Sequence, residues 1–247
     1  YFLLAGLLVF SGMQAQIVNI PDANFKAKLL EASENIHIAV DSDGNSFKID
    51  ANNDGEIQLS EVQNVIALHV PEANISSLEG ISSFSNLGWL ECSYNQLTSL
   101  ESLNLENLKH LYCRGNQFTS LDSSDFSGIP NLEEFDCSGG QLASLDVSGL
   151  VNLSRLICSN NNLTSINTSK CVNLNDFQCS FNQLTSLDVS DNINLGNVLF
   201  NNNLLTSLDF STNRHFEVKE FVEFGSNFFV NNNLLTSIIF PKSVPID

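Results

Sequence analysis

A short stretch in the first quarter of the chain has the residue types and spacing of a calcium-binding loop. Residues 50 to 61 fit the pattern D-x-[DN]-x-[DN]-G-x5-E without a mismatch. This spacing turns oxygen-bearing side chains inward, and Gly55 permits the sharp bend between them. Gln58 occupies the loop position that often binds the ion through a water molecule, and Ile57 is expected to point into the core. The expected ligands are the side chains of Asp50, Asn52 and Asp54, the carbonyl oxygen of Glu56 and the bidentate carboxylate of Glu61.

The surroundings of this loop leave an alternative open. Residues 45 to 49 do not have the pattern of an entering helix, so the loop resembles the half EF-hand of dockerins more than a complete EF-hand. The alternative is an Asx-rich turn that caps a helix near Ser60 and binds no metal. The upstream run from Asp41 to Asn45 lacks a glutamate at loop spacing, and no second site is predicted there.

The loop lies in a non-repetitive region, residues 17 to 66, which must position it. Asp22 is a candidate helix N-cap, and Phe25 and Leu29 follow at helical spacing. Residues 60 to 68 predict a second short helix or the first turn of the array that follows. We expect this region to be an N-terminal cap, because the end of a repeat array exposes apolar surface that needs a polar-faced cover.

Residues 67 to 240 are organised as leucine-rich repeats. Apolar anchors recur at separations of 21, 24, 21, 21 and 21 residues, in the pattern Leu-x-x-Leu-x-Leu-x-x-Asn-x-Leu with Cys in place of the third Leu. The expected fold is an α/β-class, right-handed solenoid with a curved parallel sheet, a convex side made mostly of loops, and little helix. The anchors are Leu90, Leu111, Phe135, Leu156, Phe177 and Val198.

Two ladders of identical residues follow from this repeat. The asparagines are expected to bond backbone groups of the neighbouring turn, with Gly140 as a break in the series. The cysteines take a position filled by Phe200 and Val230 in later repeats, so buried thiols are favoured over strained rung-to-rung disulfides or a thiolate metal site. Cys171 is also expected to be a structural residue that packs in the core. The asparagine ladder is Asn95, Asn116, Asn161, Asn182, Asn203 and Asn233, and the cysteine ladder is Cys92, Cys113, Cys137, Cys158 and Cys179.

Alternation along each strand predicts which residues face outward on the concave sheet. Tyr94 and Phe181 are expected at strand ends, and aromatic residues with arginine are the usual anchors of binding hot spots. The first outward column is Trp89, His110, Glu134, Arg155, Asp176 and Asn197; the second is Glu91, Tyr112, Asp136, Ile157, Gln178 and Leu199; the third is Ser93, Arg114, Ser138, Ser159, Ser180 and Asn201. We take as candidate binding residues Trp89, Glu91, Tyr94, His110, Tyr112, Arg114, Glu134, Asp136, Arg155, Asp176 and Phe181.

Composition and the chain ends narrow the class of protein. A net charge of −18 argues against nucleic acid or anionic membrane as a partner. Residues 1 to 16 have the apolar run and small residues of a secretory signal peptide, too short to span a membrane. Without an initiator Met or a basic n-region, the start is expected to be truncated, and so is the tail from 241 to 247. The irregular stretch from 214 to 224 is expected to be an expanded convex segment.

Catalysis is not predicted. The four histidines are scattered, and no metalloprotease, phosphate-loop or nucleophile-elbow motif is present. Glu134 and Asp136 could form a carboxylate pair, but a glycosidase also needs a cleft that separates and desolvates its acids, which an open sheet does not supply.

The chain as a whole resembles secreted bacterial leucine-rich-repeat proteins and, more distantly, internalin-like surface proteins. The resemblance covers roughly residues 17 to 240 and is carried by residues 18 to 25, the loop from Asn53 to Glu61, residues 74 to 81, and the Cys-Ser-x-Asn-Gln-Leu-Thr-Ser-Leu units. It implies a calcium-associated N-terminal cap, a curved solenoid, and protein recognition at or outside the bacterial cell surface. From the outward columns we expect a non-enzymatic monomer that binds a protein through its concave sheet. A glycan-binding adhesin and a structural spacer within a larger surface protein are the alternatives.

Overall fold

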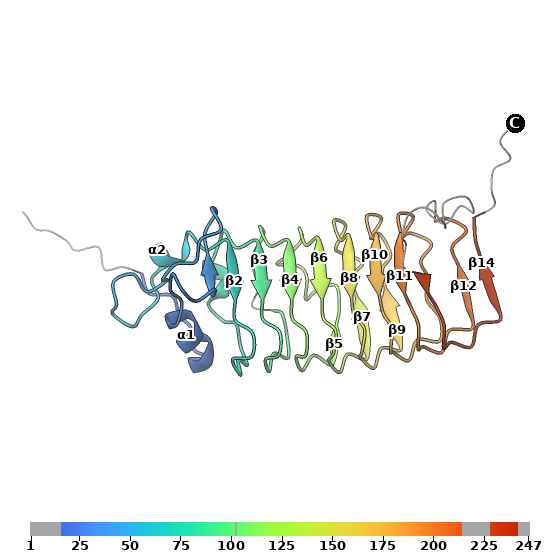
Figure 1. Ribbon diagram of the computed structural model, residues 1–247, viewed down its shortest axis with the longest axis horizontal. Coiled ribbons are helices and arrows are strands. Elements are labelled where there is room, and N and C mark those ends of the chain that lie inside the picture. Colours follow the sequence, from blue (N-terminus) through green and yellow to red (C-terminus); the bar gives the residue numbers. More distant parts are fainter. Residues whose placement is uncertain (1–15, 102, 214–227, 242–247) are drawn as a thin grey trace, which may run out of the picture.

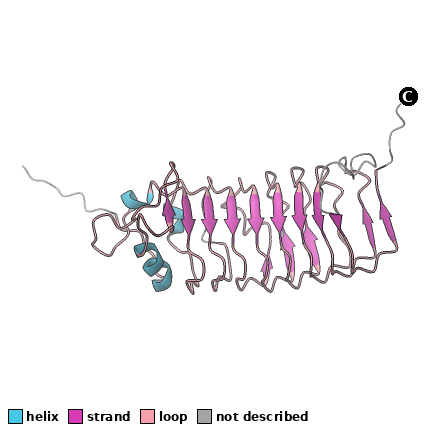
Figure 2. Cartoon of the chain, in the orientation of Figure 1, coloured by secondary structure: helices cyan, strands magenta, loops and turns pink. Residues whose placement is uncertain are grey.

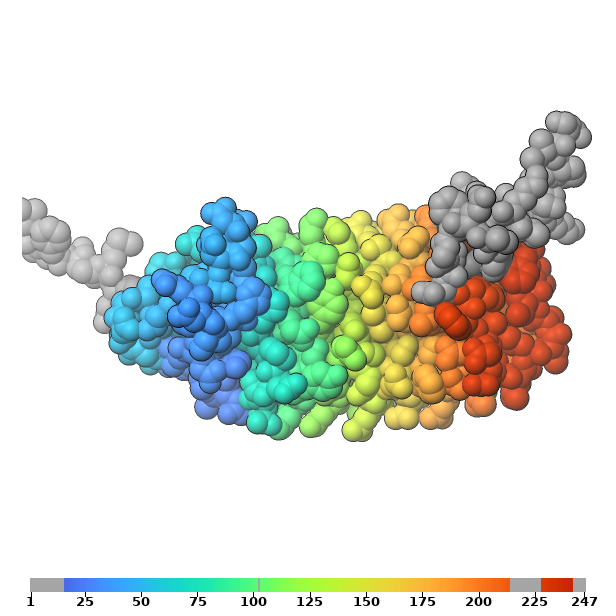
Figure 3. Space-filling model, in the orientation of Figure 1, coloured from blue at the N-terminus to red at the C-terminus, as the bar shows by residue number. Residues whose placement is uncertain are grey.

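The chain forms an elongated stack of turns with a small cap at its N-terminal end (Figures 1 and 3). A computed structural model describes residues 16–101, 103–213 and 228–241. The expected signal peptide up to residue 15, the expanded segment from 214 to 224 and the tail from 242 lie outside these residues. Within the described ranges, no helix combines the length and the apolarity needed to cross a bilayer.

Helices occur only at the cap end of the described chain (Figure 2). Helix α1 (Ala23–Leu30) begins at Asp22, whose carboxylate accepts hydrogen bonds from the backbone N–H groups of Asn24 and Phe25, as the sequence predicted. Helix α2 (Leu59–Val62) is a single turn, and a 3-10 turn, η1 (Ile81–Ser83), follows the first repeat. Phe25 and Leu29 are fully buried, so α1 packs its apolar side against the end of the stack.

The described strands form one long sheet and two short ones. The long sheet, called the main sheet below, has the order β1-β2-β3-β4-β6-β8-β10-β11-β13; its β1–β2 pair is antiparallel and its other pairs are parallel. Its strands are β1 (Ala39–Val40), β2 (Ala67–His69), β3 (Trp89–Glu91), β4 (His110–Tyr112), β6 (Glu134–Asp136), β8 (Arg155–Ile157), β10 (Asp176–Gln178), β11 (Asn197–Leu199) and β13 (Phe228–Phe229).

Each three-residue strand of the main sheet contributes its central residue to a continuous core. The predicted anchors, from Leu90 to Val198, are all at most 1% exposed, and the ladder cysteines that follow β3, β4, β6, β8 and β10 are buried as well. A fully buried Leu or Phe side chain contributes roughly 1.5–3 kcal/mol relative to an exposed one, so the anchors hold the stack together. The predicted leucine-rich-repeat solenoid is thereby confirmed.

The return side of the stack is more regular than the sequence suggested. Loops were expected there, but five segments that begin with Ser-Leu or Ser-Ile form two short parallel sheets, β5-β7-β9 and β12-β14. Leu121, Leu145 and Leu208 are buried in them, and one buried residue per turn is enough to fix the register. These strands are β5 (Ser120–Leu121), β7 (Ser144–Asp146), β9 (Ser165–Asn167), β12 (Ser207–Asp209) and β14 (Ser237–Ile239).

The asparagine ladder has the predicted role. Asn116 is buried; its side-chain amide donates to the carbonyls of Cys92 and Cys113 and accepts from the N–H of Leu97. A second asparagine row was not predicted. These side chains donate to a backbone carbonyl one turn earlier and are mostly exposed, and the signal for them is the Asn-Leu pair before each strand. The row includes Asn86, Asn107, Asn131, Asn173 and Asn194.

All six cysteines are buried and free, as predicted for packing residues. Burial raises the pKa of the ladder thiols, above all those of Cys113, Cys137 and Cys158. They therefore stay protonated at neutral pH, and a thiol in that state is neither a good nucleophile nor a metal ligand.

Candidate functional site

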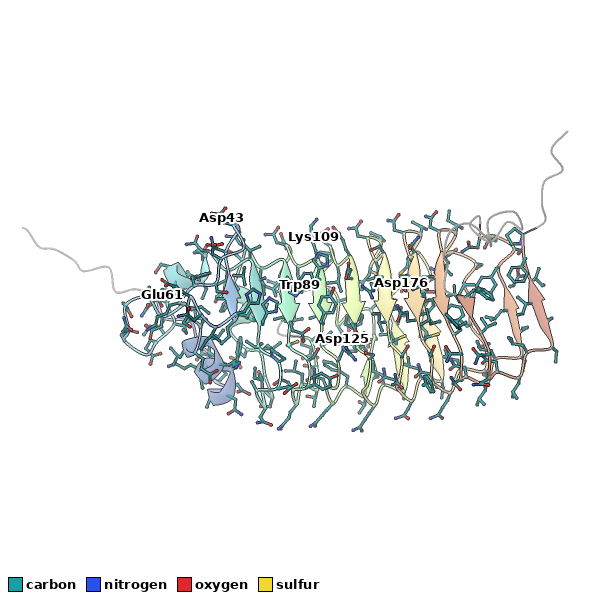
Figure 4. The ribbon with its side chains drawn as sticks, in the orientation of Figure 1. Asp43, Glu61, Trp89, Lys109, Asp125 and Asp176 are labelled. Atoms are coloured by element: carbon teal, nitrogen blue, oxygen red, sulfur yellow. The ribbon has the colours of Figure 1, made fainter. Side chains whose placement is uncertain are left out.

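The register of the main sheet aligns the predicted outward residues into rows. Trp89 pairs with His110, and the row continues through Glu134, Arg155, Asp176 and Asn197. The second row runs from His69 through Glu91 and Tyr112 to Asp136 and beyond. Figure 4 labels Trp89 and Asp176 near the two ends of this surface. The sheet thus brings the candidate binding residues onto one face, which we call the outer face.

Three rings at the N-terminal part of the outer face form an aromatic platform, defined as Trp89, His110 and Tyr112. The Trp89 ring centroid lies 4.7 Å from that of His110 and 4.9 Å from that of Tyr112, both tilted. Such pairs contribute roughly 0.5–1.5 kcal/mol beyond their buried area. The indole Nε1 of Trp89 is buried and has no hydrogen-bond acceptor among the described residues. His110 Nδ1 is likewise buried without a hydrogen-bond partner among these residues, so the platform is a rigid surface with two unsatisfied nitrogens.

A chain of polar contacts connects this platform to the middle of the sheet. The Tyr112 hydroxyl donates a short hydrogen bond to Glu134, and His110 Nδ1 lies 3.8 Å from the same carboxylate. Burial, together with the hydrogen bond to Glu134, raises the pKa of Tyr112, so its hydroxyl stays protonated as a donor. Arg155 lies between Glu134 at 4.0 Å and Asp176 at 3.1 Å. These contacts hold the outward side chains in place before any ligand arrives.

Asp136 departs from the sequence prediction. It was expected to be exposed on the outer face, but its side chain is 8% exposed and accepts hydrogen bonds from the backbone and hydroxyl of Ser138, with Arg114 at 3.7 Å. Its role is to hold the turn and Arg114, which is 51% exposed. Three serines of the third column are also buried rather than outward, and the hydroxyl of each makes a hydrogen bond with a protein group: Ser93, Ser138 and Ser180.

Tyr94 and Phe181 occupy a strained turn position at the rim of the outer face. Four residues after each anchor the backbone is left-handed, a conformation that glycine and asparagine adopt most readily, as at Gly115 and Asn160. Tyr94 (φ 57°) and Phe181 (φ 58°) adopt it with side chains 52% and 54% exposed. Bulky residues held in such a conformation concentrate at functional sites, so both stay candidate contact residues.

Two histidines belong to this surface and were not among the predicted site residues. The rings of His37 and His69 lie 4.6 Å apart, which joins the cap to the first strand of the repeats. Burial and the neighbouring His37 lower the pKa of His69, so His69 is neutral at neutral pH. The repeat alignment could have identified His69, because it holds the position of Glu91 and Tyr112. His37 lies in the non-repetitive cap and gives no such signal.

The loop of residues 50 to 61 is closed by hydrogen bonds between its own groups. Asp50 is buried and accepts from the N–H groups of Asp54 and Gly55, and the two oxygens of Glu61 accept from the N–H groups of Ala51 and Gln58. Ile57 is fully buried, as predicted. Gly55, with φ at +78°, makes the bend that the motif requires.

The donor set of this loop suits a hard cation, although its side chains are not gathered around a single point. Among the described residues, no three His, Cys, Asp or Glu side chains converge as a metal cluster. The amides of Asn52 and Gln58 instead donate to Asp54 Oδ2, and a hydrogen bond from the Glu56 N–H lowers the pKa of Asp54. A carboxylate oxygen keeps a further lone pair after accepting one N–H, so these residues fit Ca²⁺ once the two amides rotate away.

Comparison with known proteins supports the repeat architecture. Residues 106–150 match the family model described as Leucine Rich repeats (2 copies). The functional domain of InlJ from Listeria monocytogenes, described as including a cysteine ladder, is similar with a TM-score of 0.55 and 25% identity, over 87% of this chain and 48% of that one. Internalin C2 from Listeria monocytogenes gives a TM-score of 0.46 and 19% identity, over 91% and 98%.

No curated protein matches this chain. The chain spans about half the length of the InlJ structure that it resembles. The likeness therefore establishes a leucine-rich-repeat solenoid similar to an internalin domain.

Proposed function

We propose that this chain is a non-catalytic, secreted or cell-surface protein that binds another protein through the outer face of its main sheet. The observation that carries the proposal is the continuous network on that face, which runs from the aromatic platform through Glu134 and Arg155 to Asp176. Protein interfaces are enriched in Trp, Tyr and Arg at their centres. The network also keeps these side chains ordered, which lowers the entropic cost of binding.

The binding test begins with capture of a partner by the chain without residues 1–16. A double variant, Trp89→Ala with Tyr112→Ala, should then weaken binding by more than about 1 kcal/mol, or roughly fivefold in Kd, because it removes the aromatic anchors. The fold should persist, since both rings are half-buried on the surface and lie outside the core. Calorimetry on the purified pair measures the change, and circular dichroism checks the fold.

Two further variants separate the possible causes. Val172→Ala removes an exposed apolar side chain that is not among the candidate binding residues, and it should change affinity little. Tyr112→Phe keeps the ring and loses only the hydrogen bond to Glu134. Unchanged affinity in the double variant would place the binding site on the cap or the return side. Binding of oligosaccharides alone on a glycan array would support the adhesin alternative, since stacked aromatic rings also suit sugars.

We also propose that residues 50 to 61 bind one Ca²⁺, with Asp50, Asn52, Asp54, Glu56 and Glu61 as ligands, and that this ion stabilises the cap. The support is the complete ligand spacing, and Lys26 leaves the Glu56 carbonyl free because its ion pair, at 2.6 Å, uses the Glu56 side chain. A ligand at a hundred times its Kd stabilises the folded state by about 2.7 kcal/mol.

Calcium should therefore raise the melting temperature of the cap by several degrees relative to chelator. Asp54→Ala should abolish this difference because it removes a ligand at the centre of the loop. Asp43→Ala is the matched control, since it removes the same charge from the neighbouring exposed turn and should preserve the calcium effect. Identical melting curves of the unaltered protein with calcium and with chelator would rule out the site.

A further inference from the structure

One carboxylate on the outer face differs from the others in having no cationic partner. Glu134 and Asp176 both contact Arg155, and Asp136 contacts Arg114. Glu91 instead accepts a hydrogen bond from the backbone N–H of Ser93, and no Lys, Arg or His nitrogen of the described residues lies within 4.0 Å of it. Its charge is thus available to a ligand.

The register places this carboxylate directly beside the aromatic platform. Glu91 is the direct neighbour of Tyr112 on β4, and Trp89 lies two residues earlier on the same strand, facing the same side. Neighbouring strands lie about 4.8 Å apart, and residues i and i+2 about 6.6 Å, so all three side chains are within reach of one ligand group. Trp89 and Tyr112 are half-buried, which leaves part of each ring open to solvent.

The surrounding groups do not neutralise Glu91. On its other side, the direct neighbour of Glu91 is His69, which burial and His37 keep neutral. Arg114, two residues beyond the end of β4, is directed to Asp136 and to the Tyr94 ring, 5.9 Å from its guanidinium carbon. An aromatic face next to an unpaired carboxylate attracts a cation by two mechanisms, the ring quadrupole and the charge.

We propose that the aromatic platform and Glu91 together accept a basic side chain, from an arginine above all, of a protein partner. This inference rests on the function proposed above and names the chemistry of the anchor. Arginine fits better than lysine because its planar guanidinium stacks on aromatic faces while it pairs with a carboxylate. The charge of the whole chain, −18, attracts a basic partner segment over longer distances.

Trp89 is the single tryptophan of the chain, so its fluorescence reports on this position alone. Titration of the full chain with tetra-arginine amide should change the Trp89 emission to saturation, tetra-lysine amide should bind more weakly, and tetra-serine amide should have no effect. Glu91→Gln should raise the apparent Kd for tetra-arginine by about fivefold or more, as expected for a desolvated charge contact. Glu106→Gln is the control, because it removes the same charge from an exposed turn. It should raise the apparent Kd for tetra-arginine less than twofold, since it changes only the net charge of the chain.

Equal effects of the two substitutions, or no saturable change in emission, would overturn the inference. A response to chito- or xylo-oligosaccharides with none to tetra-arginine would also overturn it, in favour of a sugar at this platform. With a captured protein partner, failure of the basic anchor can be distinguished from failure of the proposed function. Loss of affinity in the Trp89/Tyr112 double variant but not in Glu91→Gln refutes the basic anchor and leaves the proposed function standing; no loss in the double variant refutes the proposed function itself.

Discussion

Replacing Cys137 by aspartate should abolish the folded stack, whereas Cys137→Val should cost less than about 1.5 kcal/mol. Cys137 is 2% exposed in the middle of the ladder, between Cys113 and Cys158. Valine nearly conserves its volume and polarity, and volume-conserving substitutions are tolerated best in a packed core. An aspartate there would bury a charge with no partner, at a cost of several kcal/mol against a total stability of about 5–15 kcal/mol.

A graded series makes this prediction measurable even if the aspartate variant cannot be purified. Cys137→Ser buries a hydroxyl and should fall between the other two, at about 1–3 kcal/mol. Urea unfolding followed by circular dichroism gives the order Val, Ser, Asp. In the unaltered protein, burial raises the pKa of the thiol, so iodoacetamide should modify Cys137 only after unfolding. An aspartate variant as stable as the valine variant would show that the ladder position is open to solvent.

The repeat pattern correctly predicts the positions of residues that recur once in every turn. The anchors, the ladder cysteines and the asparagine ladder all lie where the repeat alignment put them, because each turn repeats the environment of the previous one. The outer rows from Trp89 and from Glu91 follow from the same spacing. For these residues, with the exception of Asp136, strand alternation decides which side chains are inside.

Contacts between distant segments could not be predicted in this way. Asp22 was identified as a helix cap, yet its second oxygen accepts hydrogen bonds from Ser76 and Ser77, which ties α1 to the first repeat. Burial raises the pKa of Asp22, but the hydrogen bonds from Phe25 and Ser76 outweigh it and lower the pKa overall. The burial of Asp136 likewise depends on its Ser138 contacts, and a single-sequence pattern contains no information about such side-chain bonds.

Asparagine substitutions should separate the two asparagine rows, which look alike in the sequence. Asn182 is 8% exposed; its amide donates to the carbonyls of Cys158 and Cys179, both at 3.0 Å, and accepts from the N–H of Leu163. Asn182→Ala leaves the buried N–H of Leu163 without a partner, which costs about 1–3 kcal/mol. It also removes one of the two amide donors to each of the Cys158 and Cys179 carbonyls, which keep those of Asn161 and Asn203. With about 0.5–1.5 kcal/mol for each of the two lost carbonyl bonds, we expect a total loss of at least about 2 kcal/mol.

Asn173→Ala is the matched control, because Asn173 donates to the Val151 carbonyl from an exposed position where water can replace it. Its cost should stay below about 1 kcal/mol. Urea midpoints compare the two variants, and amide hydrogen exchange shows where the structure opens. In Asn182→Ala the lost protection should begin at the N–H of Leu163 and spread to the neighbouring turns, since repeats are stabilised mainly by their neighbours. Equal midpoints for the two variants would mean that solvent reaches the inner ladder, and the asparagines would then specify turn geometry without contributing to the stability of the stack.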